Sequence, residues 1–130
     1  MNSVAVTHDR ILVGFKPIDD LHREFEAIVA ALNDPAEGDY GAHLLALHEH
    51  LLRHCNTEEQ FMLQENYPHY ARHKRAHELL LDSVSDMRRR FDGGDIAGVR
   101  RYSADLMNWF VVHASSEDTE LVAFLRGVTA

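Results

Sequence analysis

The sequence "RHKRAHELLLD" spans Arg72–Asp82 and places two histidines in a helical pattern. His73 and His77 stand one helical turn apart. Leu80 and Val84 continue the same spacing, so all four side chains share one face of a helix. That face carries the apolar residues and should be the buried one. The stretch therefore predicts a helix that directs two histidines into the interior of the protein.

Clusters of turn-forming residues divide the chain into four segments of helical length. They are "NDPAEGD" at 33–39, "NYPHY" at 66–70 and "FDGGD" at 91–95. Each segment carries one row of mainly apolar residues at steps of three or four, and no strand alternation or internal repeat interrupts them. The rows are, in chain order, Ile18, His22, Phe25, Val29 and Leu32; Leu44, Leu47, Leu51, His54, Glu58 and Phe61; His73, His77, Leu80, Val84, Met87 and Phe91; and Val99, Tyr102, Leu106, Trp109 and His113.

These rows predict an all-α fold, an up-down-up-down antiparallel four-helix bundle with a short C-terminal helix from about Glu117 to Leu125. The length of 130 residues suits one domain with a real core. We expect a single domain over residues 1–130, with an N-terminal arm at about 1–17, the bundle at about 18–114 and a C-terminal segment at 115–130.

Charge and composition narrow the function. The formal net charge is −8, which argues against nucleic acid or an anionic membrane surface as a partner. The single cysteine, Cys55, allows no disulfide within the chain. The first residues lack the pattern of a signal peptide, and no apolar stretch approaches transmembrane length. We therefore expect a cytoplasmic protein without a membrane association.

Six polar residues occupy the otherwise apolar rows: His22, His54, Glu58, His73, His77 and His113. In an antiparallel bundle, the start of the first helix, the end of the second, the start of the third and the end of the fourth meet at one end. A lone histidine in such a row is more often a core residue satisfied by a neighbour. Glu58 is harder to explain in that way, because a fully buried glutamate almost never lacks a partner. Convergence of all six at one end instead predicts a metal site.

The number of ligands favours two metal ions. A structural zinc ion needs only about four ligands, fewer than this set offers. Two cations about 3.5–4 Å apart need carboxylates that span both, and Glu58 is one such group. A second should follow His113, where spacing alone does not choose among Glu117, Asp118 and Glu120. The remaining histidines are expected to face solvent, namely His8, His43, His48, His50 and His69.

Four motifs resemble those of the hemerythrin family. They are "IDDLH" (18–22), "HCNTEE" (54–59), "YPHYARHKRAH" (67–77) and "WFVVHASSED" (109–118). Together they match the pattern H…HxxxE…HxxxH…HxxxxD from about Leu12 to Leu125, and the combined spacing is very specific. The resemblance implies a non-haem diiron centre that binds O2 reversibly, with two Fe ions joined by an oxide or hydroxide.

The resemblance also implies a ligand set. His73, His77 and His113 would hold one iron, and His22 and His54 the other. Glu58 and Asp118 would bridge the two ions. With one bridging oxide or hydroxide, these groups supply eleven of the twelve bonds that two six-coordinate irons need. The missing bond belongs to the iron with two histidines, where O2 or a competing small anion such as azide would bind.

The expected O2 pocket is small and apolar. Phe25 follows His22 by one turn and Trp109 precedes His113 by one turn, so both should face the open iron, with Val111 as a weaker candidate. The simpler interpretation of both aromatic residues is plain core, and the two roles are compatible. The leading interpretation is a binding protein for O2 carriage, storage or sensing rather than an enzyme. The alternatives are a diiron enzyme that reduces peroxide or nitric oxide, and an iron or redox sensor that acts through a separate, unknown protein partner.

Overall fold

Helices make up nearly all of residues 11–34 and 38–129, the part of the chain that the computed structural model describes. α5 runs without a break through the π-helix η1 into α6, so these three form one long rod. The elements are α2 (Lys16–Asn33), α3 (Tyr40–Gln64), α4 (Tyr70–Asp92), α5 (Ile96–His113), η1 (Ala114–Asp118) and α6 (Thr119–Thr129).

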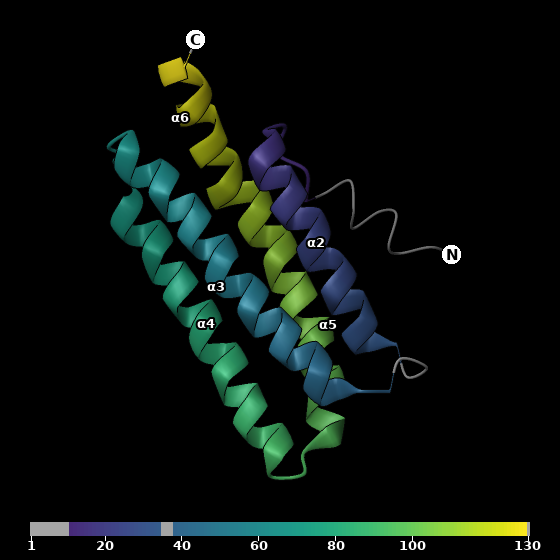
Figure 1. Ribbon diagram of the computed structural model, residues 1–130. Helices are drawn as coiled ribbons and strands as arrows, with labels where there is room; N and C mark the ends of the chain where they lie inside the picture. Colours follow the sequence, from purple (N-terminus) through teal and green to yellow (C-terminus); the bar gives the residue numbers. More distant parts are fainter. Residues whose placement is uncertain (1–10, 35–37, 130) are drawn as a thin grey trace.

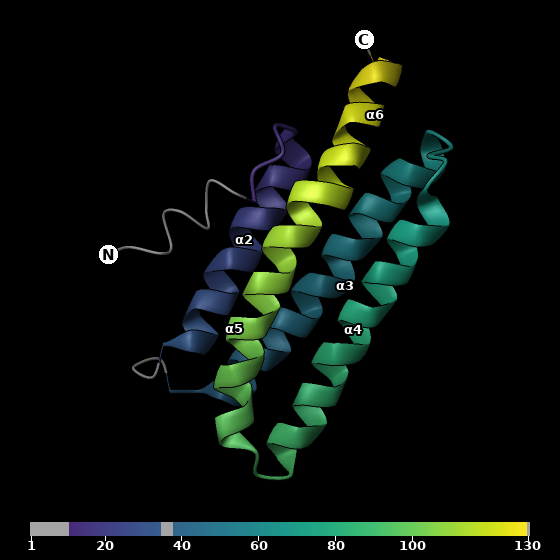
Figure 2. The same cartoon turned by 180° about the vertical axis from the view of Figure 1, so that it is seen from behind.

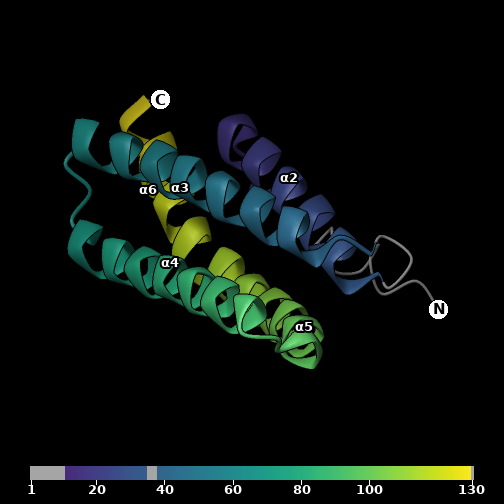
Figure 3. The same ribbon diagram turned by 60° about the horizontal axis from the view of Figure 1, so that its bottom comes forward.

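Four of these helices form an antiparallel bundle, as the sequence predicts. α2 packs against α3 and α5, and α4 packs against the same two helices, so each has two main neighbours. Figures 1 and 2 show the chain running alternately down and up, with α6 extending beyond the bundle at the end where α2 begins. Figure 3 turns the opposite end forward, where α3 and α5 begin. The all-α, up-down-up-down fold with a short C-terminal helix is confirmed.

Local signals define the helix ends. Pro17 lies in the first turn of α2, where its missing N–H costs no hydrogen bond. Asp39 caps α3 by accepting a hydrogen bond from the backbone N–H of Ala42 at 3.0 Å. Asp95 caps α5 in the same way, through the N–H of Gly98 at 2.9 Å. The turn clusters at 33–39 and 91–95 thus supply the residues that cap the starts of α3 and α5.

Two apolar clusters enclose a polar layer. The larger cluster fills the middle and lower bundle, with members from all four helices. The smaller cluster lies beyond the polar layer, where α6 covers the start of α2 and the end of α3. Its buried members are Ile18, Met62, Tyr67, Leu121, Val122 and Leu125. Apolar side chains on both sides shield the polar layer from water.

The predicted rows are buried with four exceptions. Phe61, Phe91 and Tyr102 are half-buried, and Trp109 is exposed. The prediction that Trp109 is a core residue is wrong, because the buried face of α5 passes through Ser103 and Phe110. A step of four from Val99 or from Leu106 leads to these two residues, whereas a step of three leads to Tyr102 and Trp109.

Among the described residues, no helix combines the length and the apolar character of a transmembrane span. α3 is the longest at 25 residues and carries Glu49, Arg53 and Glu59 along its length. The cytoplasmic location stays a prediction.

Candidate metal centre

The seven ligands that the family resemblance implies converge at one end of the bundle. Each is at most 5% exposed. The ring and carboxylate atoms form two overlapping groups. The three-histidine group contains His73, His77 and His113, and the two-histidine group contains His22 and His54. Glu58 belongs to both groups, and its ligand atoms lie within 4.8 Å of the others in each.

Glu58 divides its two oxygens between the groups. Oε1 lies 3.2 Å from Nε2 of His73 and 3.0 Å from Nε2 of His77. Oε2 lies 2.9 Å from Nε2 of His54 and 3.6 Å from Nε2 of His22. One carboxylate therefore spans the gap between the two sets of imidazoles.

Asp118 divides its oxygens in the same manner. Oδ1 lies 3.0 Å from Nε2 of His73 and 3.2 Å from Nε2 of His113, while Oδ2 lies 3.0 Å from Nε2 of His22. Of the three acidic residues after His113, Asp118 is thus the one at the cluster. Glu117 contacts the outer side of His113 and Glu120 is exposed.

The π-helix explains how residues five apart reach one site. In an α-helix, Asp118 would point well away from His113. Across Ala114–Asp118 the chain instead forms wider turns, and the backbone N–H of Thr119 bonds to the carbonyl of Ala114. The Thr119 hydroxyl donates to the same carbonyl at 2.8 Å. This widening places both side chains on the inner face.

Four of the five histidine rings are also contacted at their outer nitrogen, and the exception is His73, whose Nδ1 is buried without a hydrogen-bond partner. All five direct Nε2 toward the carboxylates, which leaves Nδ1 for other partners. Nδ1 of His22 bonds to the carbonyl of Ile11 at 2.6 Å, and Nδ1 of His77 contacts Glu59 at 2.8 Å. Nδ1 of His113 lies 3.2 Å from Glu117. Such outer contacts fix the ring orientation and the tautomer of metal-binding histidines.

The Ile11 carbonyl is itself held in place. The Asp19 carboxylate accepts hydrogen bonds from the backbone N–H of Val13 at 2.7 Å and of Gly14 at 3.1 Å. Gly14 adopts a left-handed φ of 79°, which favours glycine, and Arg126 of α6 bonds to its carbonyl. Asp19 thereby anchors the segment before α2 against His22.

Several buried polar atoms lack a hydrogen bond within the protein. They include Nε2 of His22, Nε2 of His113 and both oxygens of Asp118, although they lie only 3.0–3.2 Å from one another. Their close contacts are therefore poorly aligned as hydrogen bonds. Buried groups of this kind cost about 1–3 kcal/mol each when unsatisfied. A cation between them would satisfy the lone pairs together, so the residues present fit a metal-binding site.

Without metal, the cluster is a set of strongly coupled acids and bases. Burial alone would lower the pKa of His22, but the carboxylates of Asp118 and Glu58 raise it to about 10. Burial would also lower the pKa of His73, but the same two carboxylates raise it to about 9. Burial would raise the pKa of Glu58, but its imidazole neighbours, His54 first, hold it well below its usual range. Metal binding must therefore displace protons from the rings.

An apolar wall flanks the two-histidine group. The Phe110 ring lies 4.8 Å from the His22 ring, edge to face, and 4.1 Å from the Phe25 ring. Phe25 in turn lies 6.3 Å from His54. Helical spacing predicts Phe25 beside this group and gives no sign of Phe110, and the part of Phe25 in an O2 pocket stays a prediction. Val111 is also buried in the larger apolar cluster, and its part in an O2 pocket stays a prediction.

Trp109 lies on the other side of the centre. Its ring stacks on His113 with centroids 4.9 Å apart and planes 11° apart. The indole is 38% exposed and borders a surface groove with Leu79 and Leu106 between α4 and α5. Trp109 thus contacts the three-histidine group from outside, away from Phe25 and Phe110.

One further histidine is buried. The prediction that His50 faces solvent is wrong, because it is 1% exposed and contacts His54. His43 and His48 are half-buried, and Nδ1 of His48 accepts a hydrogen bond from Arg88 at 2.8 Å. His69 is exposed as predicted, and His8 lies outside the described residues. The spacing of four from His54 was the signal that could have identified His50.

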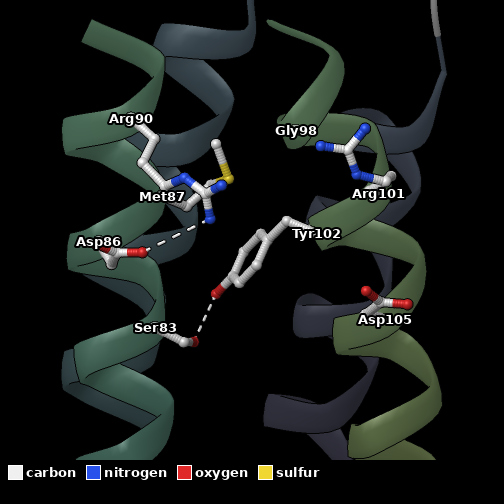
Figure 4. Close-up of a pocket in the computed structure, with 8 residues that line it drawn as sticks. All are labelled: Ser83, Asp86, Met87, Arg90, Gly98, Arg101, Tyr102 and Asp105. Atoms are coloured by element: carbon white, nitrogen blue, oxygen red, sulfur yellow. Dashed lines mark hydrogen bonds and ion pairs between the residues drawn. The ribbon is translucent and has the colours of Figure 1, made fainter. Parts of the chain in front are cut away.

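A second pocket lies toward the opposite end of the bundle. It has a volume of about 210 Å³ and lies between α4 and α5 (Figure 4). The Tyr102 hydroxyl meets Ser83 Oγ at 2.8 Å there, and Arg90 pairs with Asp86 and Asp95. None of the seven predicted ligands lines this pocket. None of its lining residues belongs to the groups that could hold a metal ion, so it is no rival to the metal centre.

Comparisons with known proteins agree with this geometry. The sequence profile of a family described as "Hemerythrin HHE cation binding domain" matches residues 13–125. Bacteriohemerythrin of Pseudomonas paraeruginosa is 29% identical over 125 residues, covering 93% of this chain and 81% of that protein. Myohemerythrin of Sipunculus nudus is 32% identical over 107 residues, covering 82% and 81%. A crystal structure of wild-type hemerythrin aligns with a TM-score of 0.76 at 26% identity, covering 87% of this chain and 90% of that one.

Proposed function

The chain belongs to the hemerythrin family, and we propose that it is a non-haem diiron protein that binds O2 reversibly, for carriage, storage or sensing. The observation that carries this proposal is the division of oxygens at Glu58 and Asp118. Each carboxylate offers one oxygen to the three-histidine group and the other to the two-histidine group. A single ion would leave half of these oxygens without a metal to bind, whereas two ions would bind all four.

The ligand roles in this proposal follow the two groups. His73, His77 and His113 hold one ion, His22 and His54 hold the other, and Glu58 and Asp118 bridge both. Two iron ions bound there would supply the redox chemistry that O2 binding needs, with the open position expected at the ion held by only two histidines. Small anions such as azide compete with O2 for that position.

The chain's own residues favour binding over turnover. Phe25 and Phe110 flank the two-histidine group, so apolar rings rather than titratable side chains line that flank. An enzyme that reduces peroxide benefits from an acid or base beside the bound molecule. The apolar rings instead exclude water and offer no proton donor to a bound molecule. We therefore propose a binding protein rather than an enzyme, with reduction of peroxide or nitric oxide as the alternative.

Metal content and a gas cycle test the proposal. After anaerobic loading with Fe²⁺, elemental analysis should give two irons per chain. The reduced, colourless protein would then be exposed to O2 and flushed with inert gas while its visible spectrum is followed. A coloured form that returns to the colourless one supports a carrier or sensor. Stoichiometric release of peroxide without return favours the enzyme, and one zinc per chain overturns the diiron proposal.

A further inference from the structure

His50 connects the centre to the protein surface. It lies one helical turn before His54 on α3, and its Nε2 is 3.0 Å from Nδ1 of His54. On its other side, Nδ1 lies 2.6 Å from Oε2 of Glu24, which projects from α2. Glu24 is about half exposed, with 47% of its side chain accessible. The three side chains form a row of hydrogen-bonding groups that runs from solvent to a predicted metal ligand.

The Glu24 carboxylate favours one arrangement of donors and acceptors in this row. A carboxylate can only accept, so Nδ1 of His50 must carry a proton and donate it to Glu24. Nε2 of a neutral His50 is then an acceptor, and Nδ1 of His54 donates to it. Nε2 of His54 consequently keeps its lone pair. That is the atom that lies 2.9 Å from Glu58, inside the centre.

The opposite arrangement would block metal binding. If His50 carried its proton on Nε2, it would donate to Nδ1 of His54, and the proton of His54 would move to Nε2. Nδ1 of His50 would then present a lone pair to the Glu24 carboxylate at 2.6 Å, which is repulsive. Arg53 could stabilise that arrangement by donating to Nδ1 of His50 at 3.3 Å, but it also pairs with Glu24. Glu24 therefore selects the tautomer of both rings.

We propose that Glu24 and His50 are positioning residues for the ion held by His22 and His54: they keep His54 in the tautomer whose Nε2 binds metal. This inference rests on the proposed function in that it requires a metal at His54. It does not require that the metal bind O2. The contacts of His73, His77 and His113 do not involve His50 or Glu24, so only one of the two ions should depend on this pair.

Selective weakening of one ion is the expected result of breaking the row. Outer hydrogen bonds of metal-binding histidines are typically worth about 10–100-fold in metal affinity. His50→Leu removes the acceptor for Nδ1 of His54 and leaves a buried N–H without a partner. His50→Gln restores an acceptor, because a carboxamide oxygen can accept the hydrogen bond from Nδ1–H of His54. Glu24→Ala removes the group that selects the tautomer, at a surface position where folding is not at risk.

The measurement is a titration of the metal-free protein with Co²⁺, followed by visible absorption, with two binding steps resolved. His48→Leu and Glu49→Ala serve as matched controls on the same helix. In parallel, long-range ¹H–¹⁵N spectra of the Zn²⁺-loaded protein report which nitrogen of His54 carries the proton. His50→Leu and Glu24→Ala should weaken one Co²⁺ step about 10-fold or more and leave the other unchanged. His50→Gln and both controls should match the wild type.

The outcomes separate the two proposals. Wild-type protein that binds fewer than two Co²⁺ per chain overturns the diiron centre and with it this role of His50. If the wild type binds two ions and the Glu24 and His50 variants bind both as tightly, the positioning role is wrong while the diiron proposal stands. A wild-type spectrum with the His54 proton on Nε2 also overturns it. Loss restricted to one step, with rescue by His50→Gln, supports it.

Discussion

The two histidine groups differ in what holds their outer nitrogens. In the three-histidine group, Nδ1 of His77 and of His113 faces a carboxylate, Glu59 or Glu117. In the two-histidine group, Nδ1 of His22 meets a backbone carbonyl and Nδ1 of His54 meets a neutral ring. A carboxylate draws the Nδ1 proton more strongly and makes Nε2 a better ligand. An ion in the three-histidine group would therefore be held more firmly at His77, whereas Nδ1 of His73 is buried without a hydrogen-bond partner.

The surroundings of the two groups differ in the same sense. Glu59 and Glu117 reach the surface and pair there with Lys74 and Arg72. The two-histidine group instead lies against Phe25 and Phe110, with the Ile11 carbonyl on its outer side. The three-histidine group is thus contacted by carboxylates directly, whereas the two-histidine group is reached by a carboxylate only through His50 and is flanked by apolar rings. Under the proposed function, this division would suit a pair of ions of which only one takes O2.

The largest effect should come from Glu58, the residue that joins the two groups. Glu58→Ala removes oxygens from both and leaves two cations without a shared carboxylate, so at least half of the bound iron should be lost. Elemental analysis after anaerobic loading measures it. His48→Ala is the control, because His48 lies on the same helix and pairs with Arg88 instead. Equal iron in the two variants would contradict the assignment of Glu58 as a bridge.

The next effect concerns stability with and without metal. A ligand that binds only the folded state contributes about 4 kcal/mol at a thousandfold excess over its Kd. For a chain of this size, that corresponds to a rise in Tm of roughly 10–20 °C. Thermal melts of the metal-free and iron-loaded protein at pH 7.5 measure it. Identical midpoints would mean that a bound cation does not stabilise the folded protein.

This stability difference should also depend on pH. In the metal-free protein the pKa of His22 is raised to about 10 and that of His73 to about 9. The stabilisation from their protonated forms is complete below about pH 6.5 and is lost as the pH rises through 9 to 10. Iron binding needs unprotonated rings and becomes stronger over the same range. The gap between the two melting temperatures should therefore widen from pH 6 to pH 9, and a gap that narrows would contradict the proton displacement.

Helical periodicity predicted which residues converge but not which neighbour fills the core. From Leu106, both Trp109 and Phe110 are acceptable steps, and both lead on to His113. The sequence cannot choose, since the choice depends on the rotation of α5 toward α2 or toward α4. The structure places Phe110 against Phe25 and leaves Trp109 beside the Leu79 groove. The same ambiguity separates Met62, which is buried, from Phe61, which is half-buried.

Outer contacts were harder to predict than ligands. The ligands follow from spacing within single helices and from the family motifs. His50 instead depends on Glu24 across the α2–α3 interface, 26 residues away in sequence. The contact of His22 with Ile11 depends on a loop that Asp19 shapes. Contacts between elements carry no periodic signal, so they required the structure.

A smaller effect should follow from making the apolar wall polar. Phe25→Tyr places a hydroxyl of similar reach beside the two-histidine group, where it can recruit water or a proton. We expect unchanged iron content and a loss of the O2-bound form in air that is about 10-fold faster, which corresponds to roughly 1.4 kcal/mol of barrier. The visible spectrum followed over time measures it. Phe91→Tyr, a half-buried ring at the far end of α4, is the matched control and should behave as the wild type.

The smallest effect should come from Trp109, and it decides between the two sides of the centre. Its ring stacks on His113 from the outside, at 4.9 Å, and contributes to packing on the three-histidine group. Trp109→Ala should therefore cost about 1 kcal/mol of stability through the lost ring contact. Iron content should be unchanged, and the loss of the O2-bound form should change by less than about twofold, or roughly 0.4 kcal/mol of barrier. If Trp109→Ala instead accelerates that loss as much as Phe25→Tyr does, the indole shields the open position after all. The open position would then belong to the ion of the three-histidine group.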